Sequence, residues 1–127
     1  MDAVPTDRER VESEVRLERR ADGIAVVVLV GEHDLATRGD IEAALEAALE
    51  HGDGVAVDLS DADFIDSSTL HVLVSAARRA AENGRGFSIV LPKNGAVRQV
   101  FELTGLLTQF DSTSSLDAAV DALRRPV

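Results

Sequence analysis

The chain has 127 residues, a formal net charge of −10 at pH 7, no tryptophan or tyrosine, and no cysteine. This length predicts a single domain, and the acidic charge, without a basic stripe or an aromatic platform, predicts that it binds neither nucleic acid nor a membrane surface. The lack of cysteine excludes a disulfide, a thiolate metal site and a cysteine nucleophile, and it fits a reducing compartment.

The N-terminal segment 1–13 is polar and charged and contains one proline. This composition predicts a flexible N-terminal tail rather than a secretory signal, which would need an apolar segment. The longest apolar run, Ile24 to Val30, is far shorter than the roughly 20 residues of a membrane-spanning helix. We therefore expect a cytoplasmic protein whose single domain occupies residues 14–125.

The domain is predicted to begin with two strands around a turn. Val15 and Leu17 alternate with charged residues, and Asp22-Gly23 has the composition of a hairpin turn. The run from Ile24 to Val30 is continuously apolar and mostly β-branched. This pattern predicts a strand that is buried on both faces of a sheet.

A first helix is predicted over residues 37–52, where apolar residues recur at the spacing of one helical face. Thr37 and Asp40 have the spacing of a capping box at its start, and Gly52 is the expected stop. A short strand is predicted next, over residues 55–59. The inward positions of the helix are expected to be Ile41, Ala44, Leu45, Ala48 and Leu49.

After a connecting stretch, a second helix is predicted over residues 67–84 and a strand over residues 87–91. A shorter third helix follows within residues 94–105, with Gly105 at its end. The inward positions are expected to be Leu70, Leu73, Val74, Ala77 and Ala81 in the second helix and Val97, Val100 and Phe101 in the third.

The chain is predicted to close with a short strand at residues 107–111 and a helix over residues 112–125, in which Ser114 and Asp117 have capping-box spacing. The alternation of strands and helices after the hairpin predicts right-handed crossovers. The expected fold class is a single α/β domain with a mostly parallel β-sheet, an N-terminal antiparallel hairpin and four helices. The inward positions of the last helix are expected to be Leu116, Ala119, Val120 and Leu123.

A metal site is not expected. The acidic cluster does not match an EF-hand loop, which also needs a glycine and a distal glutamate, and no histidine has metal-ligand spacing. Glycine-rich nucleotide-binding motifs are missing as well, so no bound cofactor is predicted. The residues considered were Asp58, Asp61, Asp63, Asp66, His33, His51 and His71.

A hydrolase triad could be assembled from Ser68, His71 and Asp66, because residues three apart on a helix are neighbours. However, the Gly-x-Ser-x-Gly elbow of hydrolases is missing, and no separate acid is placed to orient the histidine. An exposed helix histidine is the favoured interpretation of His71. The protein is therefore expected not to be an enzyme.

The segment DFIDSSTLHVL, residues 63–73, places three hydroxyl residues at a strand-to-helix joint. One role is structural, because Asp66 or Ser67 can cap the helix. Another is to receive a phosphate, since a helix N-terminus has unpaired N–H groups and a positive dipole end. A phosphoserine here would add about −1.5 to −2 charges beside Asp63 and Asp66 and would change any docked interface. Spacing alone leaves both roles open.

Three segments, in this order, resemble the STAS domain family, specifically the stand-alone anti-sigma factor antagonists of bacteria. They are LVGEHDLAT at residues 29–37, VAVDLSDADFIDSSTL at residues 55–70 and FELTGLLTQFDSTSSLDAAVDAL at residues 101–123. The second is similar to the family's strand, connection and Asp-Ser-Ser/Thr-Gly-Leu loop. The resemblance spans nearly the whole domain and implies the STAS fold.

In that family the domain binds an anti-sigma factor that is also a serine kinase of the GHKL type, and this binding frees a sigma factor. The resemblance implies phosphorylation of Ser68, with Ser67 as the alternative acceptor, and reversal by a PP2C-type phosphatase. Phosphorylation would disable the antagonist. The residues expected to bind the partner are Asp34, Asp63, Asp66, Ser67, Ser68, Thr69 and His71.

Two residues depart from the family pattern. Thr69 stands where the family usually has glycine, and His33 replaces an apolar residue between Glu32 and Asp34. Both are expected near the docking face, where a glycine leaves room for the partner to approach. The threonine at position 69 favours an alternative function, a STAS adapter that does not use phosphorylation, such as a subunit of a lipid-transport ATPase or a small-ligand sensor.

Overall fold

The computed structural model describes residues 13–51 and 53–124. The predicted helix stop at Gly52 and all but one residue of the predicted tail lie outside this part of the chain. The elements are β1 (Glu14–Arg19), β2 (Ile24–His33), α1 (Leu35–His51), β3 (Gly54–Asp58), β4 (Ala62–Ile65), α2 (Ser67–Glu82), β5 (Gly86–Val90), α3 (Ala96–Thr104), the 3-10 turn η2 (Leu106–Thr108), β6 (Asp111–Thr113) and α4 (Leu116–Arg124).

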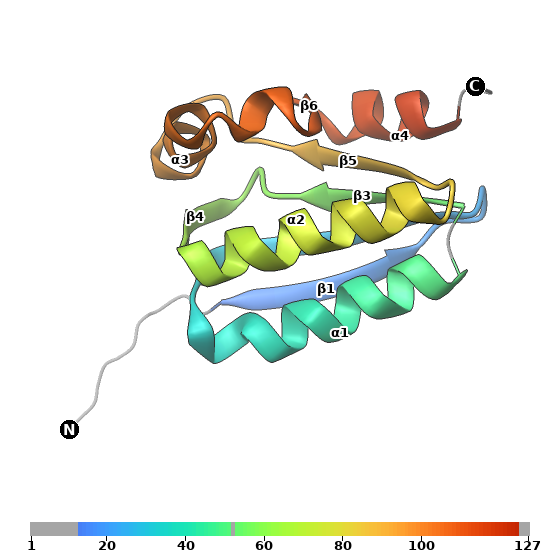
Figure 1. Cartoon of the computed structure of the whole chain (residues 1–127), viewed down its shortest axis with the longest axis horizontal. Coiled ribbons are helices and arrows are strands. Elements are labelled where there is room, and N and C mark those ends of the chain that lie inside the picture. The colour runs from blue at the N-terminus through green and yellow to red at the C-terminus, as the bar shows by residue number, and fades with distance from the viewer. Residues whose placement is uncertain (1–12, 52, 125–127) are drawn as a thin grey trace.

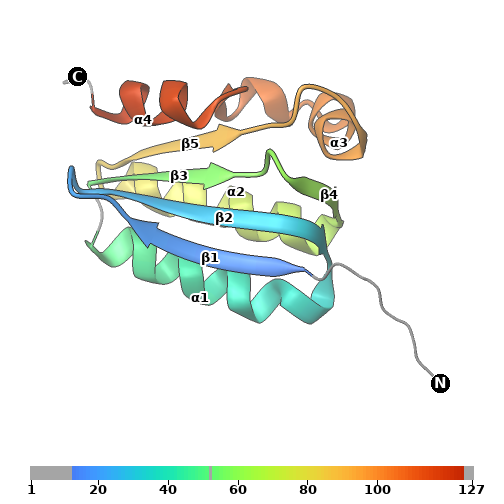
Figure 2. The ribbon, with the colours of Figure 1, turned by 180° about the vertical axis from the view of Figure 1, so that it is seen from behind.

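The sheet has the order β1-β2-β3-β5-β6, in which β1 is antiparallel to β2 and the later pairs are parallel (Figure 1 and Figure 2). β4 also pairs in parallel with the last three residues of β2, Gly31 to His33, and the register is irregular between Gly31 and Glu32. Figure 2 shows β4 set apart from β3 at one end of the sheet. The predicted α/β fold, with its N-terminal antiparallel hairpin and four helices, is confirmed.

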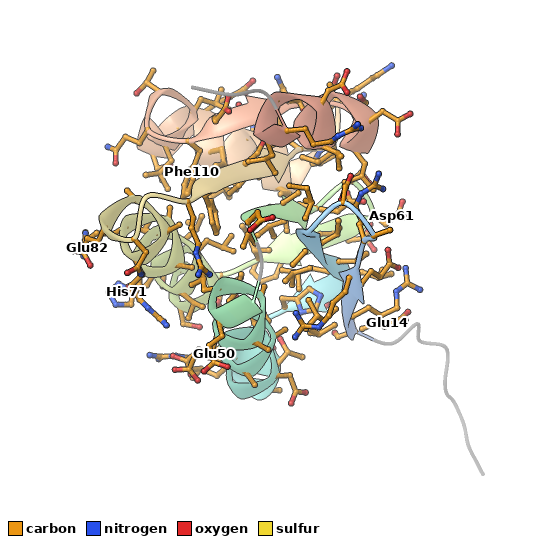
Figure 3. All side chains as sticks on the ribbon, turned by 90° about the vertical axis from the view of Figure 1, so that its right-hand side faces the viewer. Glu14, Glu50, Asp61, His71, Glu82 and Phe110 are labelled. Atoms are coloured by element: carbon orange, nitrogen blue, oxygen red, sulfur yellow. The ribbon has the colours of Figure 1, made fainter. Side chains whose placement is uncertain are left out.

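Helices cover both faces of the sheet because β2 alternates apolar side chains to each side. Val27 and Leu29 join the larger core under α1 and α2, whereas Val26 and Val28 join a smaller core under α4. The end-on view in Figure 3 shows α4 across the sheet from α1 and α2. Residues 24–29 are all buried, which confirms the prediction of a strand buried on both faces.

Two strands differ from the prediction. The stretch predicted to be a connection contains β4, whose pairing partners lie 31 or 32 residues earlier in the chain and cannot be read from a local pattern. The last strand is β6 at Asp111–Thr113, not residues 107–111. Gly105 ends α3 in the left-handed conformation (φ 77°), as predicted, but the chain then forms η2 and buries Phe110 edge-on against Phe101, with ring centroids 5.7 Å apart.

The helix starts also differ. α1 begins two residues before Thr37, and its cap is Asp34, whose Oδ1 accepts a hydrogen bond from the Ala36 amide at 2.9 Å. In α4 the cap is Ser115 rather than Ser114, because Ser115 Oγ accepts from the Ala118 amide at 3.0 Å. The buried face of α2 is rotated from the predicted one and consists of Thr69, Val72, Leu73, Ala76 and Ala80.

Candidate functional site

The segment predicted to carry function lies at one end of the sheet. Here β4 leads directly into α2, and the N-terminus of α1 follows the end of β2 (Figure 1). Because β2 and β4 are parallel and paired, both strands deliver their following helix to the same end of the molecule. The predicted serines therefore lie beside the start of α1.

Asp66 caps α2 and also holds a serine. Its backbone is extended (φ −100°, ψ −178°), and its Oδ1 accepts hydrogen bonds from the Thr69 amide and from Ser68 Oγ, each at 2.9 Å. The Thr69 amide, and secondarily the Ser68 hydroxyl, hold the pKa of the Asp66 carboxyl below its usual value. The capping role is thus confirmed, and Ser68 presents its hydroxyl to an ionised carboxylate.

The hydrolase triad considered from the sequence, Ser68, His71 and Asp66, is not assembled in the structure. The Ser68 hydroxyl donates to Asp66 rather than to His71. His71 is exposed and lies one turn further along α2, on the side that faces α1 (Figure 3). Without a histidine base on the serine, the hydrolase mechanism has no support in this geometry.

His33 and Thr69, the two departures from the family pattern, are in contact with one another. The His33 carbonyl accepts a hydrogen bond from the Asp66 amide at 3.1 Å and a longer one from Thr69 Oγ1 at 3.4 Å. Both residues have 0% exposure. Both residues lie near the expected docking face, but their side chains point into the core and support the loop from beneath, so the expectation that Thr69 itself contacts a partner is corrected.

The buried His33 ring ties β2 to α1. Its Nε2 lies 2.9 Å from the Val30 carbonyl and its Nδ1 lies 3.0 Å from Thr37 Oγ1. A carbonyl can only accept, so Nε2 carries a proton and donates to Val30. Burial lowers the pKa of His33, although the Val30 carbonyl and the charge of Asp34 oppose this shift. In the neutral ring, Nδ1 therefore accepts from the Thr37 hydroxyl.

The outer surface of this end is acidic and partly apolar. Asp34, Asp63 and Ser67 are exposed, as a partner-binding role requires, and Ser68 is half-buried. Beside them, Leu35 is 69% exposed and Phe64 is 44% exposed. The sequence patterns do not single out these two apolar residues, because Phe64 lies in the stretch predicted to be a connection and Leu35 precedes the predicted first helix.

A groove of about 350 Å³ runs between α1 and α2. Its floor includes the buried Leu45, Val72 and Ala76. Charged residues of both signs form its rim, and one pair, Arg38 with Glu42, is joined at 3.6 Å. His71, expected to bind a partner, lies on this rim, so the groove extends the candidate surface along α2. The other charged rim residues are Glu46 and Arg79.

Within residues 13–51 and 53–124, no three histidine or acidic side chains are grouped so that they could hold a metal ion. The acidic residues have other roles: Asp58 accepts from the Ser60 amide and hydroxyl, and Asp66 caps α2. In the same part of the chain, no helix is long and apolar enough to cross a membrane.

Comparison with known proteins agrees with this architecture. A family model described as "Mlab, STAS domain" matches residues 17–117. The anti-sigma factor antagonist BtrV of Bordetella bronchiseptica is 30% identical over 106 residues, which are 83% of this chain and 90% of that protein. An anti-sigma factor antagonist from Mycobacterium paratuberculosis superposes with a TM-score of 0.81 at 29% identity, covering 90% of this chain and 96% of that one.

The unphosphorylated form of the anti-sigma factor antagonist SpoIIAA has the same fold, with a TM-score of 0.75 at 22% identity, covering 90% of this chain and 99% of that one. The fold and the serine-bearing loop therefore define a STAS domain, and the chain belongs to the STAS domain family. Its relatives in sequence and in structure are anti-sigma factor antagonists.

Replacing the cap should destabilise the protein. Asp66→Ala removes the acceptor of the Thr69 amide, so the free energy of unfolding should fall by about 0.5–2 kcal/mol. The lowered pKa means that this stabilisation is present above the unfolded value near 3.8 and is lost as pH falls through the folded value. Urea unfolding at pH 7 and at low pH measures both effects. The control Asp63→Ala, at an exposed position, should stay within about 0.5 kcal/mol.

Stability should also depend on the protonation of His33. Its folded pKa lies below the ordinary value of 6.5, so the folded protein binds this proton less readily than the unfolded chain. The free energy of unfolding should therefore fall as the pH drops from about 7 to about 5. His33→Gln should flatten this slope, whereas His71→Gln, at an exposed position, should keep it. Equal slopes in the parent and His33→Gln proteins would contradict the assignment.

Proposed function

We propose that this protein is an anti-sigma factor antagonist that binds an anti-sigma factor serine kinase of the GHKL type and thereby releases a sigma factor. Phosphorylation of Ser68 disables binding, and a PP2C-type phosphatase restores it. The protein is the substrate in this cycle and not an enzyme, in keeping with the class of its relatives. It would act in the cytoplasm without touching DNA.

One contact carries the proposal: Ser68 Oγ donates to the Asp66 carboxylate at 2.9 Å at the first turn of α2. The contact fixes the hydroxyl at a helix N-terminus, where backbone N–H groups and the helix dipole favour a phosphate. The lowered pKa makes Asp66 a poor proton acceptor. Asp66 is therefore a positioning residue that orients Ser68, and the kinase supplies ATP, Mg²⁺ and the proton acceptor.

A phosphate on Ser68 would compete with Asp66. The serine would lose the hydroxyl proton that it now donates, and a group of about −1.5 to −2 charges would lie against an ionised carboxylate. Both groups need the same helix terminus, where the Thr69 amide is already bound to Asp66. We therefore expect phosphorylation to rearrange the cap.

The partner surface that fits this end is both apolar and basic. Leu35 and Phe64 are exposed among Asp34, Asp63 and Asp66, so a complementary surface would cover the apolar groups and neutralise the carboxylates. Burying a phosphate dianion against the apolar part of such an interface would cost desolvation free energy. This cost and the altered cap would together weaken the complex. SpoIIAA, which shares the fold, is known in an unphosphorylated and a phosphorylated form.

A second candidate is a phosphorylation-independent adapter, either a subunit of a lipid-transport ATPase or a small-ligand sensor. One observation favours it: the threonine at position 69, where the family usually has glycine. The inward direction of Thr69 weakens this argument, because its methyl and hydroxyl groups do not occupy the outer surface.

Phosphorylation by a GHKL-type kinase from the same organism, followed by intact-mass measurement, tests the proposal. The parent protein should gain one phosphate, Ser67→Ala should gain it as well, and Ser68→Ala should gain none. Ser68→Asp should weaken binding to the same kinase by roughly tenfold or more. An unmodified parent protein whose binding is unaffected by Ser68→Asp would support the adapter instead. If only the Ser67→Ala variant fails to gain the phosphate, the phosphorylation site is Ser67 rather than Ser68.

A further inference from the structure

We propose that the free edge of β1 pairs with β1 of a second copy of this chain, joining two sheets into one across a two-fold axis at Leu17. Among the residues that the structure describes, β1 is the first strand of the sheet and pairs with a strand only on its β2 side. It has six residues, whereas β6 at the opposite edge has three. An unpaired strand of this length presents a row of free N–H and C=O groups.

The hairpin geometry identifies the groups that face outward. The Arg20 amide donates to the Ile24 carbonyl at 2.9 Å, and the register of β1 with β2 continues without interruption from this pair to Glu14↔Val30. Hydrogen bonding to the partner strand alternates along an antiparallel pair. The even-numbered residues therefore bond to β2, and the N–H and C=O groups of Val15, Leu17 and Arg19 point away from the sheet.

A second copy can satisfy these groups when odd residues face odd residues in an antiparallel pair. If Leu17 faces Leu17 of the other copy, Val15 faces Arg19, Glu14 faces Arg20 and Arg16 faces Glu18. Every charged pair on the exposed face then has opposite signs, and each occurs twice by symmetry.

The neighbouring registers lack this complementarity. Shifting one copy by two residues places Arg16 opposite Arg16 and Glu14 opposite Glu18, and shifting it the other way places Glu18 opposite Glu18 and Arg16 opposite Arg20. Like charges directly opposite each other are destabilising. The charges of β1 therefore favour the register in which Leu17 faces Leu17, and this register pairs the strand along its full length.

The surrounding charge and packing also favour a second copy. The whole chain has a net charge of −10, but the stretch 14–20 contains three arginines and two glutamates, so this edge does not share the general repulsion between copies. In the monomer, Arg16 lies 3.2 Å from Glu14 and 3.8 Å from Glu18, and all three side chains are about half exposed. The arginine can therefore exchange an intrachain partner for an intermolecular one.

Helix α1 fits the same arrangement. It packs across β1 and β2, and Arg19 Nη2 reaches the Ala47 carbonyl at 3.5 Å, so the side of α1 nearest this edge includes Ala47 and, one turn earlier, Ala43. Pairing of the two β1 strands would place the two α1 helices about two strand spacings apart, which is roughly 10 Å. This distance is typical of packed helices, and small side chains permit it.

Sedimentation equilibrium of the full chain at increasing concentration tests the proposal. The apparent mass should rise from 13.5 kDa toward twice that value, and the amide signals of Val15, Leu17 and Arg19 should shift in parallel in NMR spectra. Arg16→Glu places like charges opposite each other and should raise the dimer dissociation constant by roughly tenfold or more. The charge-swapped double variant, Arg16→Glu with Glu18→Arg, should restore dimerisation.

Arg78→Glu, an exposed reversal on α2 with the same change in net charge, should dimerise like the parent protein. A mass of 13.5 kDa at all concentrations up to about 1 mM would overturn the proposal and leave β1 as an edge protected by charge. A dimer that Arg16→Glu does not weaken, or that the double variant does not restore, would place the interface elsewhere. Far-ultraviolet circular dichroism of each variant separates loss of pairing from loss of fold.

Discussion

The two hydrogen bonds that the Asp66 side chain accepts are the constraint on which the functional end of this domain depends. One carboxylate oxygen accepts from both the Thr69 amide and the Ser68 hydroxyl, so the cap that starts α2 also orients the serine. The structural and functional roles of the DFIDSSTLHVL segment are therefore compatible. A group that modifies Ser68 must disturb the cap, because both bonds use the same oxygen atom.

The cap is held from below by a second set of contacts. The His33 carbonyl binds the Asp66 amide and Thr69 Oγ1, while the His33 ring reaches back to Val30 and forward to Thr37 of α1. A change at the serine can thus be transmitted to the ends of β2 and α1. Buried polar networks of this kind favour one arrangement only while every member keeps its partner.

Local patterns predicted much of this fold. The apolar run of β2 required burial on both faces, Gly105 marked the end of α3, and Asp66 was one of two predicted caps for α2. Features that depend on distant partners were not predictable. β4 exists because it pairs with the end of β2, and the buried face of α2 depends on how that helix is set against the sheet and α1.

The site residues show the same division. The family resemblance pointed to Ser68 and Asp66, and the structure brings them together. Thr69 and His33, which depart from the family pattern, were expected near the docking face, and the sequence does not reveal that their polar groups find partners inside the core. Leu35 and Phe64 were missed for the opposite reason, since apolar residues are usually expected inside.

The central claim is that a phosphate on Ser68 switches off partner binding. The most direct measurement is isothermal titration of the anti-sigma kinase with two samples of the full chain, one unmodified and one phosphorylated by that kinase, with the phosphate located by fragmentation mass spectrometry. The account predicts a phosphate on Ser68 and an affinity lower by roughly 100-fold. Equal affinities for the two samples would contradict it.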